Sequence, residues 1–321
     1  MKRRMLVIGC GSIGLRHLRN LSRNHTVEPA GLDMNPEVAD EVRAIGSGIR
    51  FFSDFDSAAA WSPELVIVAT PNHLHRDNCL WAFGTGAHVL CEKPLATSVE
   101  EGESIVRAAD AAGLKLGMGF TERYREAVQC MIDEAASGRL GNLVGGRAMV
   151  GTYNTLLCAR DPQHRGDTFG SLVLDYVHEL DILAALFGSV RRVECMGNSI
   201  AEKELQANPS LVAAIAEYEN GAIVSINFDY VQHPQRRCLE IYGDRGALEY
   251  DFQEDLLKIF DCREPGCRVR SFGNVRDEQF IREHADMLNA IANNADPLVT
   301  GRDGLKSLQV SCMLLEKLRQ V

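Results

Sequence analysis

Three glycines close to the N-terminus constrain the fold of this chain more than any other feature. Gly9, Gly11 and Gly14 directly follow the apolar residues 5–8 and directly precede a segment of helical period. Between a strand and a helix, the first glycine permits a tight turn, the second lets a pyrophosphate approach the backbone, and the third allows the helix to pack on the strand. Backbone amides at the helix start then face the phosphates. The spacing predicts a dinucleotide site whose contacts in this turn are Gly9, Gly11, Ser12, Ile13 and Gly14.

Short apolar runs alternate with segments of helical period through residues 1–120. The strands predicted there are residues 5–8, 27–33, 65–70, 88–91 and 115–118. The helices between them are residues 15–24, 36–45, 75–83 and 98–112. Strands that alternate with helices form a parallel sheet covered on both faces. Residues 1–120 are therefore expected to form an NAD(P)-binding Rossmann domain, which is a doubly wound parallel α/β sheet.

Closely spaced strand-like runs replace this alternation in the rest of the chain. The strands predicted there are residues 143–153, 190–195, 211–219, 222–232, 237–242, 247–252 and 256–260. Asn220-Gly221 is a strong signal for a two-residue hairpin turn. Helices are predicted at residues 170–187, 278–293 and 303–319. Residues 121–321 are therefore expected to form an α+β domain with a large, open, mostly antiparallel sheet, and its C-terminal helix can pack back on the first domain.

Charge and cysteine usage exclude several classes of partner. The chain carries 44 acidic and 34 basic residues, and this net charge of −10 does not supply the basic surface that nucleic acids need. No stretch approaches the ~20 apolar residues of a membrane span. The ten cysteines are spread singly without a Cys-x-x-Cys pair, so neither a metal site nor a disulfide framework is expected. We expect a cytoplasmic protein without nucleic-acid or membrane partners.

An acidic residue ends the second predicted strand. Asp33 follows Gly14 by 19 residues, where a carboxylate can accept hydrogen bonds from both ribose hydroxyls of an adenosine. It would repel a 2′-phosphate, and no Lys or Arg follows it until Arg43. NAD is therefore expected in preference to NADP. Residues 33–36 also offer an Asp or Asn N-cap with Pro at N1 for the next helix, and the two roles can coexist.

Two motifs in the first domain carry a family resemblance. One is Ala69-Thr70-Pro71-Asn72-His73-Leu74-His75, and the other is the run from residue 86 to residue 96 that contains Glu92-Lys93-Pro94. Behind the glycine turn, these motifs resemble the Gfo/Idh/MocA oxidoreductases, and the resemblance continues to residues 297–301. It implies a Rossmann domain followed by an α/β domain whose open sheet mediates a homodimer or homotetramer. It assigns to cofactor binding Thr70, Pro71, Asn72, His75, Glu92 and Lys93.

Alternatives exist for the two most reactive side chains in these motifs. Without the resemblance, His75 would be explained as a polar residue at a helix start. Lys93 ends the fourth predicted strand, where open α/β sheets place ligands and where an ammonium can polarise a substrate oxygen. A surface lysine is the alternative. In related proteins this lysine contributes to catalysis, and the resemblance carries that role to Lys93.

The helix predicted at residues 170–187 supplies a candidate base. Asp175, His178 and Asp181 follow one another at three-residue intervals, which places them on one face of a helix. An imidazole can take the proton of an alcohol while hydride leaves the same carbon, and a carboxylate can orient it. His178 and Asp175 are the catalytic candidates, and a purely structural His is the alternative.

The family pattern D-x-G-x-H-x-x-D departs from this chain at one point. It separates Asp and His by four positions, whereas Asp175 and His178 are three apart, so the matching part is His178 to Asp181. The D-Y-x-H-E-L-D form resembles a branch linked to sugar or nonulosonate pathways. Arginines and tyrosines nearby suit a hydroxylated or anionic ligand. The predicted substrate contacts are Arg123, Tyr153, Arg160, Arg165 and Tyr176.

The resemblance implies an NAD(P)-dependent oxidoreductase. Such an enzyme would transfer a hydride between nicotinamide and the CH-OH or C=O group of a sugar, cyclitol or nucleotide-linked sugar. Two alternatives stay open at this point. One is a non-catalytic dinucleotide-binding regulator with the same fold, and the other is an oxidoreductase that acts on C=N or C=C bonds.

Overall fold

The computed structural model of the chain describes residues 2–46, 48–152, 170–199, 209–273, 275 and 277–320. These residues form two compact units that are not continuous in sequence. The first unit comprises Met1–Tyr124 and Val275–Leu308, and the second comprises Arg125–Asn274 and Gln309–Val321. Three predicted substrate contacts lie outside the described residues, namely Tyr153, Arg160 and Arg165.

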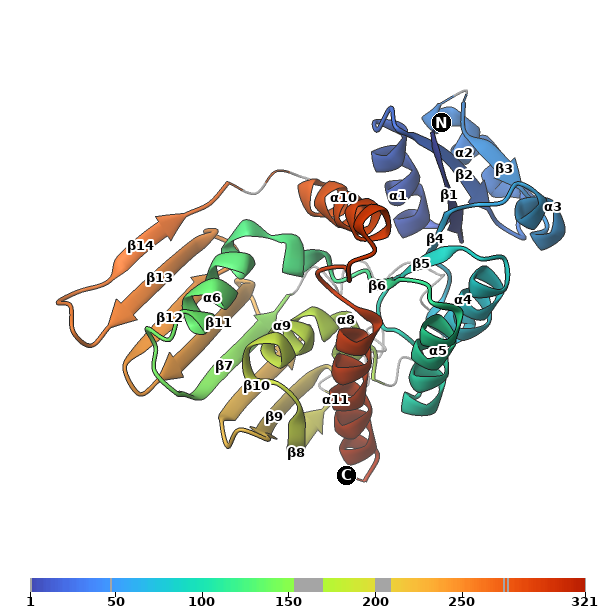
Figure 1. The fold of residues 1–321 in the computed structure, drawn as a ribbon. Helices are drawn as coiled ribbons and strands as arrows, with labels where there is room; N and C mark the ends of the chain where they lie inside the picture. The colour runs from blue at the N-terminus through green and yellow to red at the C-terminus, as the bar shows by residue number, and fades with distance from the viewer. Residues whose placement is uncertain are drawn as a thin grey trace. The chain divides into compact units, whose positions relative to one another are not determined.

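A parallel sheet forms the centre of the first unit. Over the described residues it has six strands in the order β3-β2-β1-β4-β5-β6 (Figure 1). They are β1 (Arg3–Ile8), β2 (Val27–Leu32), β3 (Arg50–Phe52), β4 (Leu65–Val68), β5 (His88–Cys91) and β6 (Leu116–Met118). Every pair is parallel, and Met5 of β1 lies opposite both Pro29 and Leu65. The predicted Rossmann sheet is confirmed, and its strand order reverses between β1 and β4, where such sheets bind ligands.

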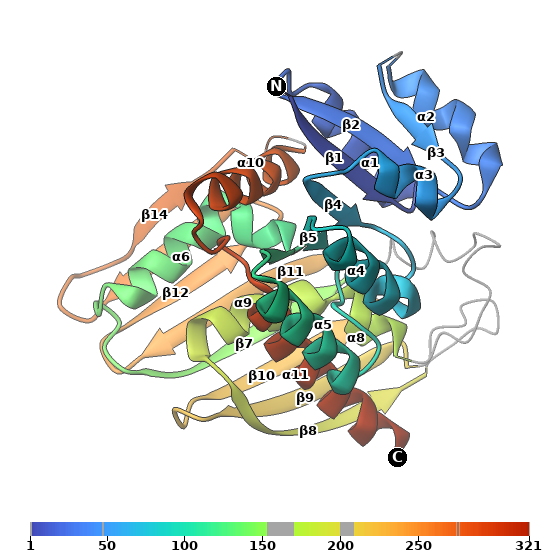
Figure 2. The ribbon, with the colours of Figure 1, turned by 45° about the vertical axis from the view of Figure 1, so that its right-hand side comes forward.

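Helices cover both faces of this sheet, and all residues of a central strand such as β4 are therefore buried. The helices are α1 (Ser12–Ser22), α2 (Ala39–Ile45), α3 (Phe55–Ala60), α4 (His75–Gly84), α5 (Val99–Ala112) and α10 (Glu278–Asn293), with the 3-10 turns η1 (Pro36–Val38), η2 (Asn72–Leu74) and η3 (Thr121–Tyr124). On one face, Leu18 of α1 and Met287 of α10 share a core with Met5 and Val7. Next to β5, α4 and α5 lie side by side (Figure 2).

The sequence patterns did not predict β3 or α3. With three and six residues, both are too short to show a clear period. A local signal for α3 was present, because the Asp54 carboxylate accepts a hydrogen bond from the Ser57 amide at 2.7 Å. An Asp in this position is a typical helix N-cap.

A larger sheet forms the second unit. Over the described residues it has eight strands in the order β14-β13-β12-β11-β7-β10-β9-β8. They are β7 (Leu143–Gly151), β8 (Val190–Asn198), β9 (Leu211–Tyr218), β10 (Ile223–Asp229), β11 (Arg236–Gly243), β12 (Gly246–Asp251), β13 (Leu256–Asp261) and β14 (Arg268–Ser271). The β7–β10 pair is parallel and the other pairs are antiparallel, which confirms the predicted mostly antiparallel sheet. Gly221 turns the β9–β10 hairpin with φ +86°.

Helices cover one face of this sheet (Figure 1). They are α6 (Glu126–Ala136), α8 (Ser171–Asp175), α9 (Val177–Phe187) and the end of α11 (Gly301–Arg319). Val128, Leu183 and Leu314 from these helices share a core with alternate residues of the strands. The other face leaves side chains such as Ile215 and Ile223 exposed. The sequence patterns did not predict β14, because all four of its residues are exposed and give no apolar period.

The helix predicted at residues 170–187 is interrupted. Tyr176, with φ −96° and ψ 25°, separates α8 from α9, so the prediction of one continuous helix is wrong. Within the described ranges, no helix combines the length and the apolar character that a bilayer span requires.

Candidate active site

The loop between β1 and α1 has open space at one glycine and none at two others. A Cβ on Gly9, where φ is +87°, would lie 2.8 Å from the backbone after β4, and a Cβ on Gly14 would lie 1.8 Å from the Gly9 carbonyl oxygen. A Cβ on Gly11 would meet no atom within 4 Å. Ser12 and Ile13 beside it are exposed at the start of α1. This backbone therefore fits a pyrophosphate placed against Gly11 and the helix N-terminus.

Asp33 joins the end of β2 to this glycine loop. Its Oδ2 accepts a hydrogen bond from the Cys10 amide at 2.7 Å, and its Oδ1 accepts one from the Asn35 amide at 2.8 Å. The helix cap is Asn35, whose side chain accepts from the Glu37 amide at 3.0 Å. Burial, followed by the charge of Asp33, raises the pKa of Cys10 to about 12, so that thiol stays protonated. Asp33 thus lies at the loop, and Asn35 takes the capping role.

His75 ties the loop after β4 to the turn after β5. Its Nδ1 lies 2.8 Å from the Pro94 carbonyl oxygen, and its Nε2 lies 2.9 Å from the Thr70 carbonyl oxygen. The side chain is buried, and burial lowers its pKa. Pro71 is exposed and Asn72 is half-buried. The accessible groups of this motif are therefore in the loop after β4, and the buried His75 side chain supports that loop.

Glu92 and Lys93 occupy the turn after β5. The Glu92 side chain is 13% exposed, and its Oε1 lies 2.9 Å from Nε2 of His17. Its Oε2 accepts a hydrogen bond from the Lys93 amide at 3.2 Å. Burial alone would raise the pKa of Glu92, but the hydrogen bond and charge of His17, together with the charge of Lys93, outweigh burial and lower it. A carboxylate and a half-buried ammonium thus lie at the C-terminal end of β5.

Two residues of this region were not among the predicted site residues. His17 lies on the buried face of α1 beside Leu18 and Leu21, and a His on an apolar helix face just after the glycine turn was its signal. Gly119 has no room for a side chain, because a Cβ there would lie 2.8 Å from the Glu92 carboxyl carbon. Only the three-dimensional structure shows that contact.

The helix interruption separates the catalytic candidates of the second unit. Asp175 ends α8, and His178 and Asp181 belong to α9, so the argument from one continuous helix face does not apply to Asp175. Asp175 is exposed and accepts a hydrogen bond from the Tyr230 hydroxyl. His178 is half-buried, with its Nδ1 atom buried.

The two described substrate candidates lie in different units. Arg123 is in η3 of the first unit and is 7% exposed. Tyr176 is half-buried in the second unit, where its hydroxyl bonds the Thr152 hydroxyl and its ring packs edge-on against Phe228 at 5.5 Å. Tyr176 is therefore fixed by neighbours on both its polar and its apolar side.

Comparison with known proteins identifies the family. A model described as an oxidoreductase family with an NAD-binding Rossmann fold matches residues 3–120, and one for the Gfo/Idh/MocA C-terminal domain matches residues 128–249. Inositol 2-dehydrogenase from Rhodococcus erythropolis is 30% identical over 87% of this chain and 82% of its own length. This chain belongs to the Gfo/Idh/MocA oxidoreductase family. It is an NAD-dependent oxidoreductase, which confirms the family, the enzyme class and the cofactor expected from the sequence.

Other relatives span nearly the whole chain. Glucose-6-phosphate 3-dehydrogenase from Bacillus subtilis is 28% identical over 97% of this chain and 95% of its own length. An Agrobacterium radiobacter oxidoreductase, solved with NAD+, L-tartaric acid and magnesium, has a TM-score of 0.88 at 17% identity and covers 99% of this chain and 97% of its own. Levoglucosan dehydrogenase, solved with NADH and levoglucosan, has a TM-score of 0.86 at 20% identity and covers 100% of this chain and 98% of its own. These two structures support the fold.

Proposed function

We propose that the substrate is a cyclic polyol, a sugar or a cyclitol, and that one of its secondary alcohols is oxidised to a ketone. The observation that carries this proposal is the near full-length similarity to relatives named as dehydrogenases of glucose 6-phosphate and of inositol, which align with 97% and 87% of this chain. The first unit would hold NAD, and the second unit would supply substrate contacts and the base.

The glycine loop, Asp33 and the loop after β4 are the groups that would hold NAD. Gly11 and the start of α1 fit the pyrophosphate. A carboxylate has about four acceptor positions, and the amides of Cys10 and Asn35 use two of those of Asp33. Asp33 therefore keeps acceptors for the adenosine ribose hydroxyls. Thr70, Pro71 and Asn72 would line the nicotinamide side, with His75 holding them. When bound, NAD supplies the hydride acceptor.

Lys93 and His178 would carry the proton chemistry. The Lys93 ammonium would stabilise the developing alkoxide of the substrate. His178 Nε2 would take the hydroxyl proton, since its Nδ1 is buried. Asp175 would be a secondary candidate, because it precedes the helix interruption. Arg123 and Tyr176, together with Tyr153, Arg160 and Arg165 outside the described residues, are the proposed substrate contacts.

Assembly and location complete the proposal. The open face of the β7–β14 sheet exposes Val144, Ile215 and Ile223, and apolar side chains gathered on one face are typical of interaction surfaces. We propose that this face forms a homodimer or homotetramer. A cytoplasmic location is proposed with it, because the described cysteines are free thiols, as in reducing compartments.

Purified protein with NAD and a panel of sugars, sugar phosphates and cyclitols tests the substrate class. NADH formation, followed by its absorbance, is expected with at least one cyclic polyol. Simple aliphatic and aromatic alcohols form the control panel. Turnover of these controls without turnover of any polyol would contradict the proposal.

A further inference from the structure

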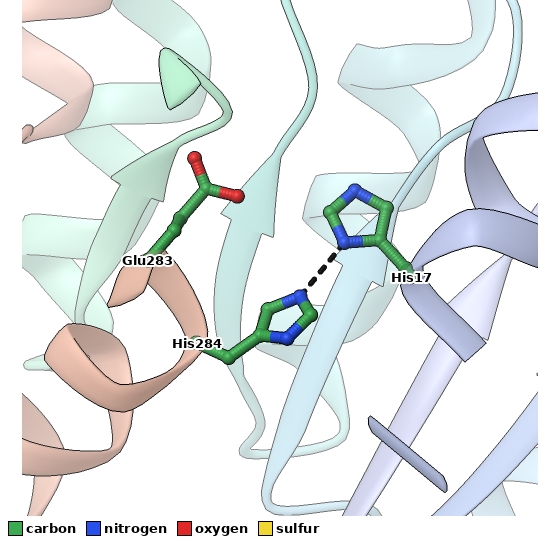
Figure 3. Close-up of side chains that lie close together, drawn as sticks. All are labelled: His17, Glu283 and His284. Atoms are coloured by element: carbon green, nitrogen blue, oxygen red, sulfur yellow. Dashed lines mark hydrogen bonds between the residues drawn. The ribbon is translucent and has the colours of Figure 1, made fainter. Parts of the chain in front are cut away.

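A buried polar cluster lies behind Glu92 in the first unit. It consists of Glu92 after β5, His17 of α1, and Glu283 and His284 of α10 (Figure 3 shows the last three). His17 and Glu283 are 0% exposed and His284 is 4% exposed. Such a concentration of ionisable groups away from water is costly unless the groups serve one another.

Hydrogen bonds connect three members of this Glu92 cluster in a chain. His17 Nε2 lies 2.9 Å from Glu92 Oε1, and His17 Nδ1 lies 2.8 Å from His284 Nε2. The second oxygen of Glu92 accepts from the Lys93 amide. Each Glu92 oxygen therefore has its own partner, and the imidazole of His17 is held at both nitrogens.

Packing fixes the same carboxylate from another side. Gly119 lies so close that a Cβ would come within 2.8 Å of the Glu92 carboxyl carbon and within 3.0 Å of both its oxygens. The Gly119 amide also donates to the Cys91 carbonyl oxygen at 2.7 Å. Phe280 meets His17 edge-on, with ring centroids 5.1 Å apart. Glu92 and His17 thus have little freedom to move.

The charges of the cluster are set by its surroundings. Burial and then the charge of His17 hold the pKa of His284 well below its ordinary value, so His284 is neutral. Burial and then the charges of Glu92 and Asp286 hold the pKa of Glu283 well above its ordinary value, so Glu283 is protonated. Lys93, in the turn after β5, lies close enough for its charge to lower the pKa of Glu92. The lowered pKa of Glu92 leaves it as the ionised carboxylate.

We propose that His17, backed by His284, is a positioning residue that fixes the Glu92 carboxylate and, through the Lys93 amide, the turn that presents the Lys93 ammonium. This inference rests on the proposed role of Lys93 at the reacting alcohol. His17 does not touch substrate in this scheme. His17 instead fixes the position of the Lys93 ammonium before substrate binds.

A hydrogen-bonded proton explains the histidine pair better than a metal ion does. His17, Glu283 and His284 each place a possible ligand atom within 4.8 Å of the others. The two facing nitrogens are 2.8 Å apart, which is a hydrogen-bond length. Two imidazole nitrogens on a tetrahedral zinc, each ~2.0–2.1 Å from it, would be about 3.3 Å apart. The observed distance between the two nitrogens therefore fits a hydrogen bond and is too short for two ligands of one zinc ion.

A set of single and double variants tests the positioning role by activity. His17→Phe keeps the ring and removes its hydrogen bonds, and we expect kcat to fall about 10- to 100-fold, as for a displaced catalytic group, with the Kd for NAD unchanged. His17→Gln, whose amide can donate to Glu92, should restore most of kcat. Glu283→Gln is the matched control within the cluster and should keep native kcat. The double variant His17→Phe with Glu92→Gln should lower kcat no further than the more damaging of the two single changes, since both changes remove one interaction.

A second readout needs no turnover. Acylation of lysines in the cofactor-free protein, followed by mass spectrometry, should label Lys93 faster in His17→Phe than in the native protein. Lys258 of the second unit, which is 46% exposed, is the internal control and should label equally in both. If the native protein oxidised no polyol, the proposed function would fail while this measurement still tested the positioning role.

Three results would overturn the inference. Native kcat and native Lys93 labelling in His17→Phe would show that His17 positions nothing. A loss of kcat that tracks the unfolded fraction and is not restored by Gln would show a role in folding alone. One equivalent of zinc in the purified protein, lost on His17→Phe, would show that the cluster is a metal site.

Discussion

The two units bury their candidate histidines to different degrees. In the first unit, His75 and His17 are buried, and both nitrogens of each ring lie within 2.9 Å of a partner atom. In the second unit, His178 follows directly after a helix interruption, is half-buried, and buries Nδ1. A buried imidazole whose two nitrogens both face protein atoms can orient loops but offers neither nitrogen to a ligand. Under the proposed function, the buried histidines of the first unit position loops and His178 of the second unit takes the proton.

The largest expected effect tests the proposed role of His178 as the general base. His178→Ala should lower kcat by about 10²- to 10⁴-fold, as when a general base is removed. The Kd for NAD, measured by titration calorimetry, should stay native because the cofactor groups belong to the first unit. Asp175→Asn is the matched control, and it should cost less because Asp175 lies before the interruption and bonds Tyr230. Equal losses in the two variants would place Asp175 in the reaction.

The glycine loop allows a similarly direct test of the proposed cofactor site in the first unit. Gly11→Ala adds a Cβ where no atom lies within 4 Å, so folding should be unaffected while NAD binding weakens by about 1–3 kcal/mol from steric overlap with the cofactor. Gly14→Ala, whose Cβ would lie 1.8 Å from Gly9, should instead lower the melting temperature. Native NAD affinity in Gly11→Ala would show that the pyrophosphate lies elsewhere.

Asp33 should decide the choice between the two dinucleotides. Asp33→Ala removes acceptors for the ribose hydroxyls and a charge that repels a 2′-phosphate. We expect NAD binding to weaken by about 1–3 kcal/mol, as for a lost hydrogen bond to a charged group, and the preference over NADP to narrow. Dissociation constants for both cofactors measure this. Tighter binding of NADP than NAD by the native protein would refute the assignment.

The smallest expected effect concerns the pH dependence of stability. The pKa of Glu283 is raised above its ordinary value of 4.5 by burial and by Glu92 and Asp286. The unfolded chain therefore ionises Glu283 near pH 4.5 while the folded chain keeps the proton, so stability from this group is lost as the pH rises above 4.5. Glu283→Gln should gain stability over the native protein by about 1 kcal/mol for each pH unit between pH 5 and pH 7. Parallel melting curves across this range would contradict the protonated state.

The sequence predicted what depends on period and spacing, and it missed what depends on contacts between distant segments. Alternating runs were enough to predict both sheets except for β3 and β14, and the glycine spacing located the loop before α1. The hydrogen bond between His17 and His284 joins residues 267 positions apart, and no local sequence pattern predicts it. The interruption at Tyr176 was also missed, because residues 170–187 contain neither Pro nor an internal Gly that would break a helix.

The contribution of α10 to the first unit has a consequence for how the chain is made. Met287 packs into the core beside Met5 and Leu18, and the Met118 amide donates to the Val299 carbonyl oxygen at 3.1 Å. A ribosome translates residues 1–124 long before these partners emerge, since α10 begins only at Glu278. The part of the nascent first unit that α10 later covers therefore stays uncovered while residues 125–274 are synthesised. During that interval it presents the kind of surface that chaperones bind and that aggregation exploits.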